Sequence, residues 1–197
     1  MSITEATKKL VVKLESENAQ ERYTAVDVLS KKHDSQIIQL LISLLETDTS
    51  IYFREGACKI LGKLKAKEAL DELVSCLSDP DEGVNFHAAV ALSNINESKA
   101  VKPILEILNQ KTIDPVFKSE LIIALGNFGD NLAVDPLISI LRYDKDIFVR
   151  HEAARALGKI GNQKAIGALS EVAKKDKDNQ LHYLALNAIN TIFEKEN

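Results

Sequence analysis

A period of about thirty-two residues runs through this chain of 197 residues. Six polar residues mark the period at intervals of 32, 31, 33, 32 and 32 positions: Asn18, Ser50, Asp81, Asp114, Asp146 and Asp178. An aliphatic residue follows each of them eleven positions later: Leu29, Leu61, Leu92, Leu125, Leu157 and Ile189. The variation in length falls just before each polar residue. Fixed internal spacing with variable joints predicts an array of similar rigid units joined by loops.

Each unit opens with a residue type that caps helices. Asn, Ser and Asp accept hydrogen bonds from the free N–H groups of a first helical turn, so the six polar residues are predicted N-caps. Pro115 follows the fourth cap, at a position where a helix loses nothing by lacking an N–H. Apolar residues then recur at helical spacing, and residues 133–141 form a second apolar stretch too long for a strand.

A column of small residues follows the aliphatic one and predicts close approach of a neighbouring helix. It comprises Ser30, Gly62, Ser93, Gly126, Gly158 and Asn190. Eight residues after the aliphatic column comes a further apolar column of Ile37, Ala69, Ala100, Ala133 and Ala165.

Each unit is therefore a predicted pair of helices, with a short turn that Gly129 or Gly161 marks in two copies. Residues 4–16 match a second helix alone, and residues 179–195 match a first helix alone. This predicts an all-α fold of about twelve antiparallel helices with a half repeat at each end. Helix pairs cannot bury their apolar faces singly. We therefore expect one right-handed α-solenoid domain over residues 1–197, with repeats starting near residues 18, 50, 81, 114, 146 and 178.

Composition and charge limit the class of protein and the partners that this chain can have. Hydrophobic residues make up 45% of the chain and charged residues 27%, which supplies both a core and a solvated surface. No apolar run is long enough to cross a bilayer, and residues 1–5 lack the pattern of a signal peptide. We expect a cytoplasmic protein that does not bind membranes. A net charge of −4 argues against nucleic-acid binding, which needs a basic stripe.

Residues 149–161, Val-Arg-His-Glu-Ala-Ala-Arg-Ala-Leu-Gly-Lys-Ile-Gly, resemble the short HEAT repeats of the phycobilin-lyase (PBS lyase) type. In those repeats an Asp-Pro-Asp loop precedes the first helix, and residues 79–81 supply such a loop here. The resemblance covers nearly the whole chain and implies a HEAT/armadillo-like superhelix. Ankyrin and tetratricopeptide arrays have similar periods, but their Thr-Pro-Leu-His and Trp signatures are missing.

A nearly continuous basic ladder lies four residues after the caps: Arg22, Arg54, Asn85, Lys118, Arg150 and His182. In the family such side chains typically face acids in the loops of neighbouring repeats. Asp48, Asp79, Asp144 and Asp176 are spaced to serve as those acids, so we interpret the ladder as structural.

His151 and Glu152 raise the hypothesis of a metal site. Deoxyhypusine hydroxylase, a HEAT-type enzyme, binds two irons through His-Glu pairs at this position of its repeats. A metal site needs several converging ligands, and the other five repeats of this chain lack the pair. We therefore predict no metal site and an ordinary, partly exposed helix face. Cys58 and Cys76 fall on core columns, which predicts buried, reduced thiols, with a redox or chromophore-handling role as the alternative.

Solenoids bind partners on their surfaces, and in HEAT arrays the second helices line the concave face. The outward columns of these helices supply our candidate partner-binding residues: Gln39, Ser43, Glu46, Asp71, Ser75, Lys102, Glu106, Asp135, Ser139, Arg142 and Tyr143. A merely solvated face is the alternative. Ser43, Ser75 and Ser139 leave room for a partner. Acids gather at the N-terminal side and Arg142 with two lysines at the C-terminal side, which suits an elongated partner of opposite polarity.

Aromatic residues give a second candidate surface. Tyr52 and Tyr143 lie at loops between repeats and could anchor a partner, since tyrosine is favoured in interface hot spots. The last helix is apolar around more than one face, which indicates a docking end, a contact in a homodimer or heterodimer, or an imperfect cap.

No nucleophile with a base, phosphate-binding loop or zinc cluster is present in the sequence. We therefore expect a non-catalytic scaffold or adaptor that binds a protein partner on the concave face and needs no cofactor. The alternative, which only the resemblance implies, is a subunit of a bilin lyase or a factor for phycobilisome assembly or degradation. In that case a phycocyanobilin-type bilin would be handled.

Overall fold

The computed structural model describes residues 4–45, 50–110 and 112–195. Within these ranges the regular structure consists of twelve α-helices and five short 3-10 helices, without a strand. This confirms the all-α prediction and its count of helices. The chain divides into two compact units, Met1–Ile95 and Asn96–Asn197, called here the first and the second unit. A single repeat domain with a right-handed superhelix stays a prediction.

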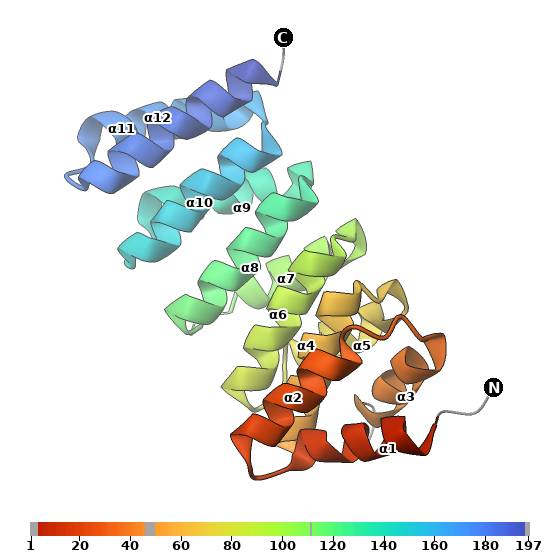
Figure 1. Ribbon diagram of the computed structural model, residues 1–197. Coiled ribbons are helices and arrows are strands. Elements are labelled where there is room, and N and C mark those ends of the chain that lie inside the picture. The colour runs from red at the N-terminus through yellow and green to blue at the C-terminus, as the bar shows by residue number, and fades with distance from the viewer. Residues whose placement is uncertain (1–3, 46–49, 111, 196–197) are drawn as a thin grey trace. The chain divides into compact units, whose positions relative to one another are not determined.

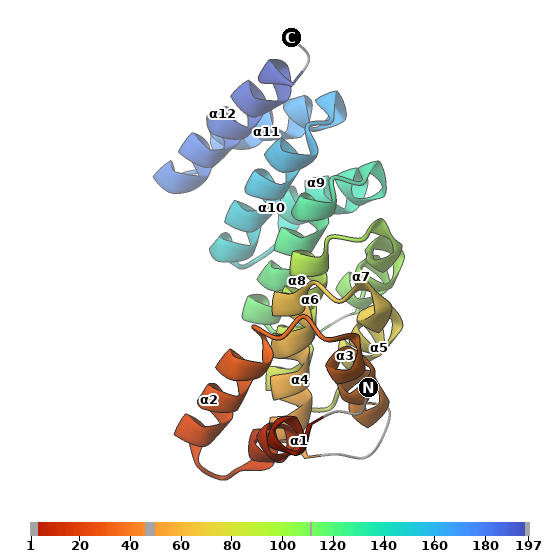
Figure 2. The same ribbon diagram turned by 45° about the vertical axis from the view of Figure 1, so that its right-hand side comes forward.

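The first unit has two layers of helices (Figures 1 and 2). One layer contains α2 (Ala19–Leu29), α4 (Ile51–Leu64) and α6 (Glu82–Ile95), and the other contains α3 (Ser35–Leu45) and α5 (Leu70–Cys76). The predicted N-terminal half repeat forms α1 (Glu5–Val12) and the 3-10 helix η1 (Lys13–Glu15), and η1 packs against α2 and α4.

The second unit repeats this arrangement. One layer contains α8 (Pro115–Phe128), α10 (Ile147–Ile160) and α12 (Asn179–Glu194), with α10 packed between the other two. The second layer contains α7 (Val101–Leu108), α9 (Val134–Tyr143) and α11 (Ile166–Lys175), which lie behind the first layer in Figure 1. The helix α12 is the predicted C-terminal half repeat.

All six predicted N-caps are formed. Each cap side chain accepts a hydrogen bond from a backbone N–H two or three residues later, as Asp146 does from Phe148 and Val149 at 2.8 and 3.1 Å. Such a cap contributes about 1 kcal/mol to helix stability. The caps therefore fix the start of every first helix, as the period predicts.

Short 3-10 helices lead into the second helices from α5 onward: η2 (Lys67–Ala69), η3 (Ser98–Ala100), η4 (Asn131–Ala133) and η5 (Gln163–Ala165). Each ends on the predicted apolar column, whose alanines are fully buried. The aliphatic column is equally deep, since Leu29, Leu61 and Leu125 have no exposed surface.

The small column allows first helices to approach closely, as predicted. A Cβ atom on Gly62 would lie 2.6 Å from the Cα of Ala91 in α6. A Cβ on Gly126 would lie 2.9 Å from the Cα of Ala156, and one on Gly158 equally close to the Cα of Ala188. These distances leave no room for a side chain, so glycine sets the spacing between neighbouring repeats.

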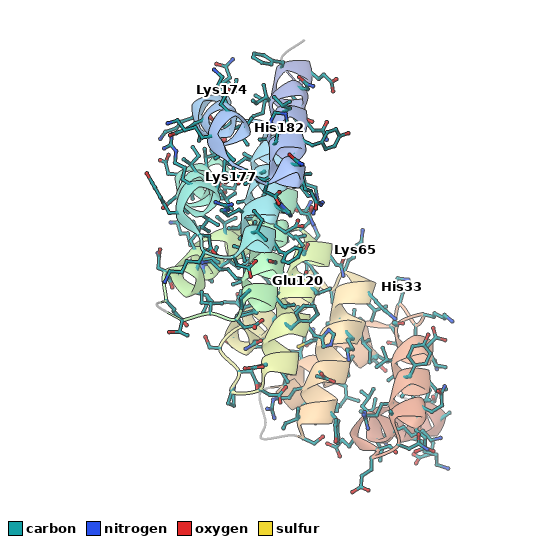
Figure 3. The ribbon with its side chains drawn as sticks, turned by 90° about the vertical axis from the view of Figure 1, so that its left-hand side faces the viewer. His33, Lys65, Glu120, Lys174, Lys177 and His182 are labelled. Atoms are coloured by element: carbon teal, nitrogen blue, oxygen red, sulfur yellow. The ribbon has the colours of Figure 1, made fainter. Side chains whose placement is uncertain are left out.

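Four first helices end in a left-handed residue. Gly129 and Gly161 have φ of 67° and 82°, and the corresponding residues Lys65 and Asn96 have φ of 52° and 58°. Lys65 lies at the C-terminal end of α4 (Figure 3). The second and third repeats thus form the same turn without the glycine.

Candidate functional site

The exposed face of α3 and α5 contains a crevice in the first unit. Gln39, Ser43, Asp71 and Ser75 are exposed there, in agreement with their outward columns. The first-unit crevice has a volume of about 480 Å³ and is lined by Leu45, Arg54, Asp71, Glu72, Ser75, Cys76 and Asp79. Glu46 lies outside the described residues.

Negative charge is in excess in the first-unit crevice. Arg54 donates to both carboxylate oxygens of Asp79, at 2.7 Å from Nε and 3.0 Å from an Nη atom, and this raises the pKa of Arg54 above its usual range. Asp71 and Glu72 have no cation within ion-pair distance among the described residues. The Oε2 atom of Glu72 is buried and accepts no hydrogen bond from the described residues. An unsatisfied buried carboxylate oxygen is costly, so this crevice favours a cationic or hydrogen-bond-donating ligand.

The exposed face of the second unit is different because two of its candidate binding residues, Asp135 and Arg142, are in ion pairs. Lys102, Glu106, Asp135, Ser139, Arg142 and Tyr143 are all exposed as predicted. Asp135 pairs with Lys164 at 2.6 Å, and Arg142 pairs with Glu171 at 3.0 Å. Glu171 also accepts from Lys175 at 3.1 Å, and the two cations, Lys175 first, lower the pKa of Glu171. The basic C-terminal side predicted from the sequence is thus neutralised only in part, since Arg142 and Lys175 share one carboxylate.

A smaller crevice of about 210 Å³ lies on this face. It is lined by Arg142, Tyr143, Glu171, Val172, Lys175 and Asp176. Aligned on the caps, Glu171 and Val172 occupy the positions of Ser75 and Cys76 in the first unit. The first-unit crevice is therefore larger because a serine replaces a long, ion-paired side chain. Asp71 and Glu72 correspond to Gly167 and Ala168, so the acidic character belongs to the first unit.

Three cations of the basic ladder form ion pairs with loop aspartates, one in the first unit and two in the second. Arg54 pairs with Asp79, Lys118 with Asp144, and Arg150 with Asp176. In each of these loops the Oδ1 oxygen of the aspartate also accepts from the backbone N–H of the next cap residue, at 2.9, 2.9 and 3.0 Å. One carboxylate thus connects a first helix to the start of the next repeat, which confirms the structural interpretation.

Two other residues of the basic ladder, Arg22 and His182, contact backbone oxygens. Arg22 donates to the backbone oxygens of Ser16 and Glu17, at 2.7 and 3.0 Å, and its guanidinium lies 4.0 Å from the ring centre of Tyr52. The Nδ1 atom of His182 lies 2.6 Å from the backbone oxygen of Ala173. Asp48 lies outside the described residues.

A family model of HEAT repeats matches residues 38–116 and 111–190 of the chain. The chain belongs to the HEAT repeat family. A comparison with curated proteins finds no match.

Solved structures of HEAT and armadillo proteins share this fold. A designed armadillo repeat protein in complex with the peptide (KR)4 is 21% identical with a TM-score of 0.67, over 96% of this chain and 100% of that one. An archaeal HEAT-like repeat protein from Thermococcus onnurineus NA1 is 18% identical with a TM-score of 0.59, over 96% and 87%. The complex of CpcE and CpcF of phycocyanin lyase from Nostoc sp. PCC7120 is 20% identical with a TM-score of 0.51, over 98% and 96%. At these low sequence identities, the structural similarity shows a common fold and nothing more.

His151 of this HEAT array is more deeply buried than the sequence suggests. Its side chain is 4% exposed, and Nε2 lies 2.9 Å from Oδ1 of Asp178, the cap of α12. The expectation of a partly exposed histidine was therefore wrong, because the next repeat covers it. Glu152 is partly exposed and pairs with Arg155. The described residues hold no cluster of three or more His, Cys, Asp or Glu side chains that could bind a metal ion.

Glu120 lies on α8 (Figure 3) and interacts electrostatically with Glu152 on α10. Burial, and then the negative charge of Glu152, raise the pKa of Glu120 above its ordinary value. The smaller of these two effects comes from an acid on the adjacent first helix, α10.

Both cysteines of the HEAT array are buried free thiols, as their columns predict. Cys58 has no exposed surface, whereas Cys76 is 7% exposed and lies in the wall of the first-unit crevice. The sequence columns place Cys76 in the core but do not reveal this crevice. Glu72 belongs to the acids that the sequence places on the N-terminal side of this face, but the burial of its Oε2 depends on packing that the sequence does not show.

Several large apolar side chains are exposed. Tyr143 is 76% exposed and Tyr52 is 44% exposed, and both lie at helix ends, at the last residue of α9 and in the first turn of α4, rather than in the loops expected from the sequence. Phe53 and Phe117 are in the core. Tyr183, Leu186 and Phe193 are exposed on α12, the last helix of the HEAT array. Within the described ranges, no helix has the length and apolar character needed to cross a bilayer.

Proposed function

We propose that this HEAT-repeat protein is a non-catalytic binding protein that holds an extended, basic segment of a partner protein on the α3–α5 face. The observation that carries the proposal is the first-unit crevice, in which Asp71 and Glu72 have no cation among the described residues. A Lys or Arg side chain of the partner would supply the missing donor. Hydrogen bonds to charged groups contribute about 1.5–3 kcal/mol each.

The distribution of charge along the chain supports a basic partner. Residues 1–95 contain 11 Lys and Arg against 15 Asp and Glu, whereas residues 96–197 contain 14 of each. The whole net charge of −4 therefore resides in the first unit. A localised negative potential attracts cationic segments and raises their association rate.

The shape of the face supports an extended ligand. Ser43 and Ser75 are short and exposed, so a partner backbone can approach α3 and α5 closely. The designed armadillo repeat protein that shares this fold is in complex with an alternating Lys-Arg peptide. An array of this architecture can therefore present a face suited to such a segment.

The test is the affinity for a fluorescent (KR)4 peptide, measured by anisotropy, with an acidic peptide of equal length as the ligand control. We expect Asp71→Asn together with Glu72→Gln to weaken binding roughly tenfold or more, because about 1.4 kcal/mol corresponds to a factor of ten. Asp135→Asn is the matched control, since Asp135 occupies the column of Asp71 but pairs with Lys164. If both variants weakened binding equally, or neither did, the crevice would not be the site.

A bilin-handling role has support from fold likeness to CpcE and CpcF alone. A bilin has carboxylate groups, which the acidic first-unit crevice would repel. We expect no bilin uptake by the purified protein, as measured by visible absorption and zinc-dependent fluorescence. Uptake by the protein, alone or with a partner subunit, would support this role instead.

A further inference from the structure

The two cysteines lie on the paired helices α4 and α5. Cys58 on α4 has no exposed surface. Cys76 is the last residue of α5 and lies in the wall of the first-unit crevice. Both are free thiols. Neither is used by the proposed peptide-binding function, so their placement calls for a separate explanation.

The Arg54–Asp79 pair holds these two thiols together. Cys58 is four residues after Arg54 on α4, so the two side chains lie on the same helix face one turn apart. Cys76 is three residues before Asp79, whose N–H donates to the carbonyl oxygen of Cys76 at 3.2 Å. Because the guanidinium and carboxylate are joined at 2.7 and 3.0 Å, the end of α5 is fixed against α4 at the level of Cys58.

The corresponding positions of the other repeats show which residues usually occupy the places of Cys58 and Cys76. The pairs, each 18 positions apart, are Val26 and Leu44, Ala89 and Ile107, Ile122 and Ile140, and Ala154 and Val172. The residues in the column of Cys58 are buried, whereas Leu44, Ile107 and Ile140 in the column of Cys76 are partly buried. All of these residues are aliphatic. Only the second repeat carries two thiols, and a crevice of about 480 Å³ opens beside Cys76.

The two thiols also differ in acidity. A hydrogen bond with Cys58 is the largest influence on Cys76 and lowers its pKa, and Arg54 contributes a smaller lowering against the opposing effects of burial and Asp79. The interaction with Cys76 and complete burial raise the pKa of Cys58. Of the two thiols, Cys76, which lines the crevice, therefore loses its proton more readily. A thiolate is the nucleophilic form.

We propose that Cys76 and Cys58 form an oxidation-sensitive dithiol site, in which Cys76 reacts with peroxide and Cys58 resolves the product into an intramolecular disulfide. The Cys76 sulfur attacks one peroxide oxygen, the O–O bond breaks, and the distal oxygen leaves as water once protonated. The Cys58 sulfur then displaces the hydroxyl of the Cys76 sulfenic acid as a second water. In total two thiols and one hydrogen peroxide give one disulfide and two waters.

This site goes beyond the proposed binding function, since it requires no protein partner. The disulfide would lie in the wall of the first-unit crevice, next to Ser75 on α5. It would also join α4 to α5 covalently beside the Arg54–Asp79 pair. Oxidation would thereby fix the two helices that form one side of the crevice.

The folded protein is treated with hydrogen peroxide, and free thiols are then blocked with N-ethylmaleimide for mass spectrometry. We expect a monomer about 2 Da lighter without maleimide adducts, a cross-linked peptide containing Cys58 and Cys76, and full reversal by dithiothreitol. Cys58→Val should leave a Cys76 sulfenic acid that dimedone traps. Cys76→Val should slow oxidation of the remaining thiol by at least about tenfold, because Cys58 is fully buried.

Both substitutions use residues that the chain already carries in these columns, Val26 and Val172, and circular dichroism verifies their folding. Three results would overturn the proposal. The folded protein could stay reduced under peroxide that oxidises the unfolded chain. It could form disulfides only between molecules. Finally, the Cys76→Val variant could oxidise as fast as the unchanged protein.

Discussion

At the scale of single residues, the left-handed turn after the first helix shows how the repeats depart from their own pattern. Lys65 adopts φ of 52° where the later repeats have Gly129 and Gly161. A non-glycine residue in this conformation costs about 1–2 kcal/mol, and glycine loses about 0.5–1 kcal/mol more backbone entropy on folding. The first unit therefore contains a strained position that glycine would relieve.

We expect Lys65→Gly to stabilise the protein by about 0.5–1 kcal/mol and Gly129→Ala to destabilise it by about 1 kcal/mol. A Cβ on Gly129 would meet nothing within 4 Å, so the loss would report backbone conformation alone. Thermal unfolding followed by circular dichroism measures both changes. A lower melting temperature for Lys65→Gly would show that the lysine side chain contributes more than its backbone costs.

At the scale of secondary-structure elements, glycine at the contact of neighbouring first helices sets the distance between repeats. A Cβ on Gly62 would lie 2.6 and 2.8 Å from the Cα and Cβ of Ala91, and backbone cannot yield as a flexible side chain can. We expect Gly62→Ala to destabilise the first unit by about 1–3 kcal/mol. Gly167→Ala in α11 is the control, because its Cβ would enter open space and should stabilise by up to about 1 kcal/mol. Urea unfolding of the two variants measures the difference, and similar shifts would argue against the close-contact explanation.

The elements are also where prediction from the sequence is strongest. The six caps, the buried columns and the glycine contacts follow from the period, because each copy repeats the same local chemistry. The period also indicates which residues of the second helices face outward, including Asp71 and Asp135. It does not show that Asp135 pairs with Lys164 while Asp71 keeps no described cation, because pairing depends on the side chains of another element. For the same reason, the column of Cys76 predicts that this thiol is buried but not that it lines a crevice. The column of His151 likewise does not show that Asp178 of the next repeat covers the ring.

At the scale of the whole molecule, the two units have different electrostatic character. The first unit carries the entire net charge of −4, and its crevice contains two carboxylates without a described cation. The second unit is neutral in sum, and its exposed Asp135 and Arg142 are already paired. A cationic partner should therefore distinguish between the units by charge, although both present the same helical architecture.

Ser75 and Ser139 test this asymmetry, because they occupy the same exposed column in the two units. We expect Ser75→Lys to weaken binding of the (KR)4 peptide roughly tenfold or more, since it would place a cation beside Asp71 and Glu72. Ser139→Lys should change the affinity by less than about twofold, because charges on an exposed, already paired face contribute little. Anisotropy titrations at 0.1 M and 1 M salt provide the measurement. The difference between the variants should shrink at high salt, since the Debye length falls from about 10 Å to about 3 Å. Equal losses for both variants would mean that the peptide recognises the array without regard to unit, and a difference insensitive to salt would point to steric obstruction by the new side chain.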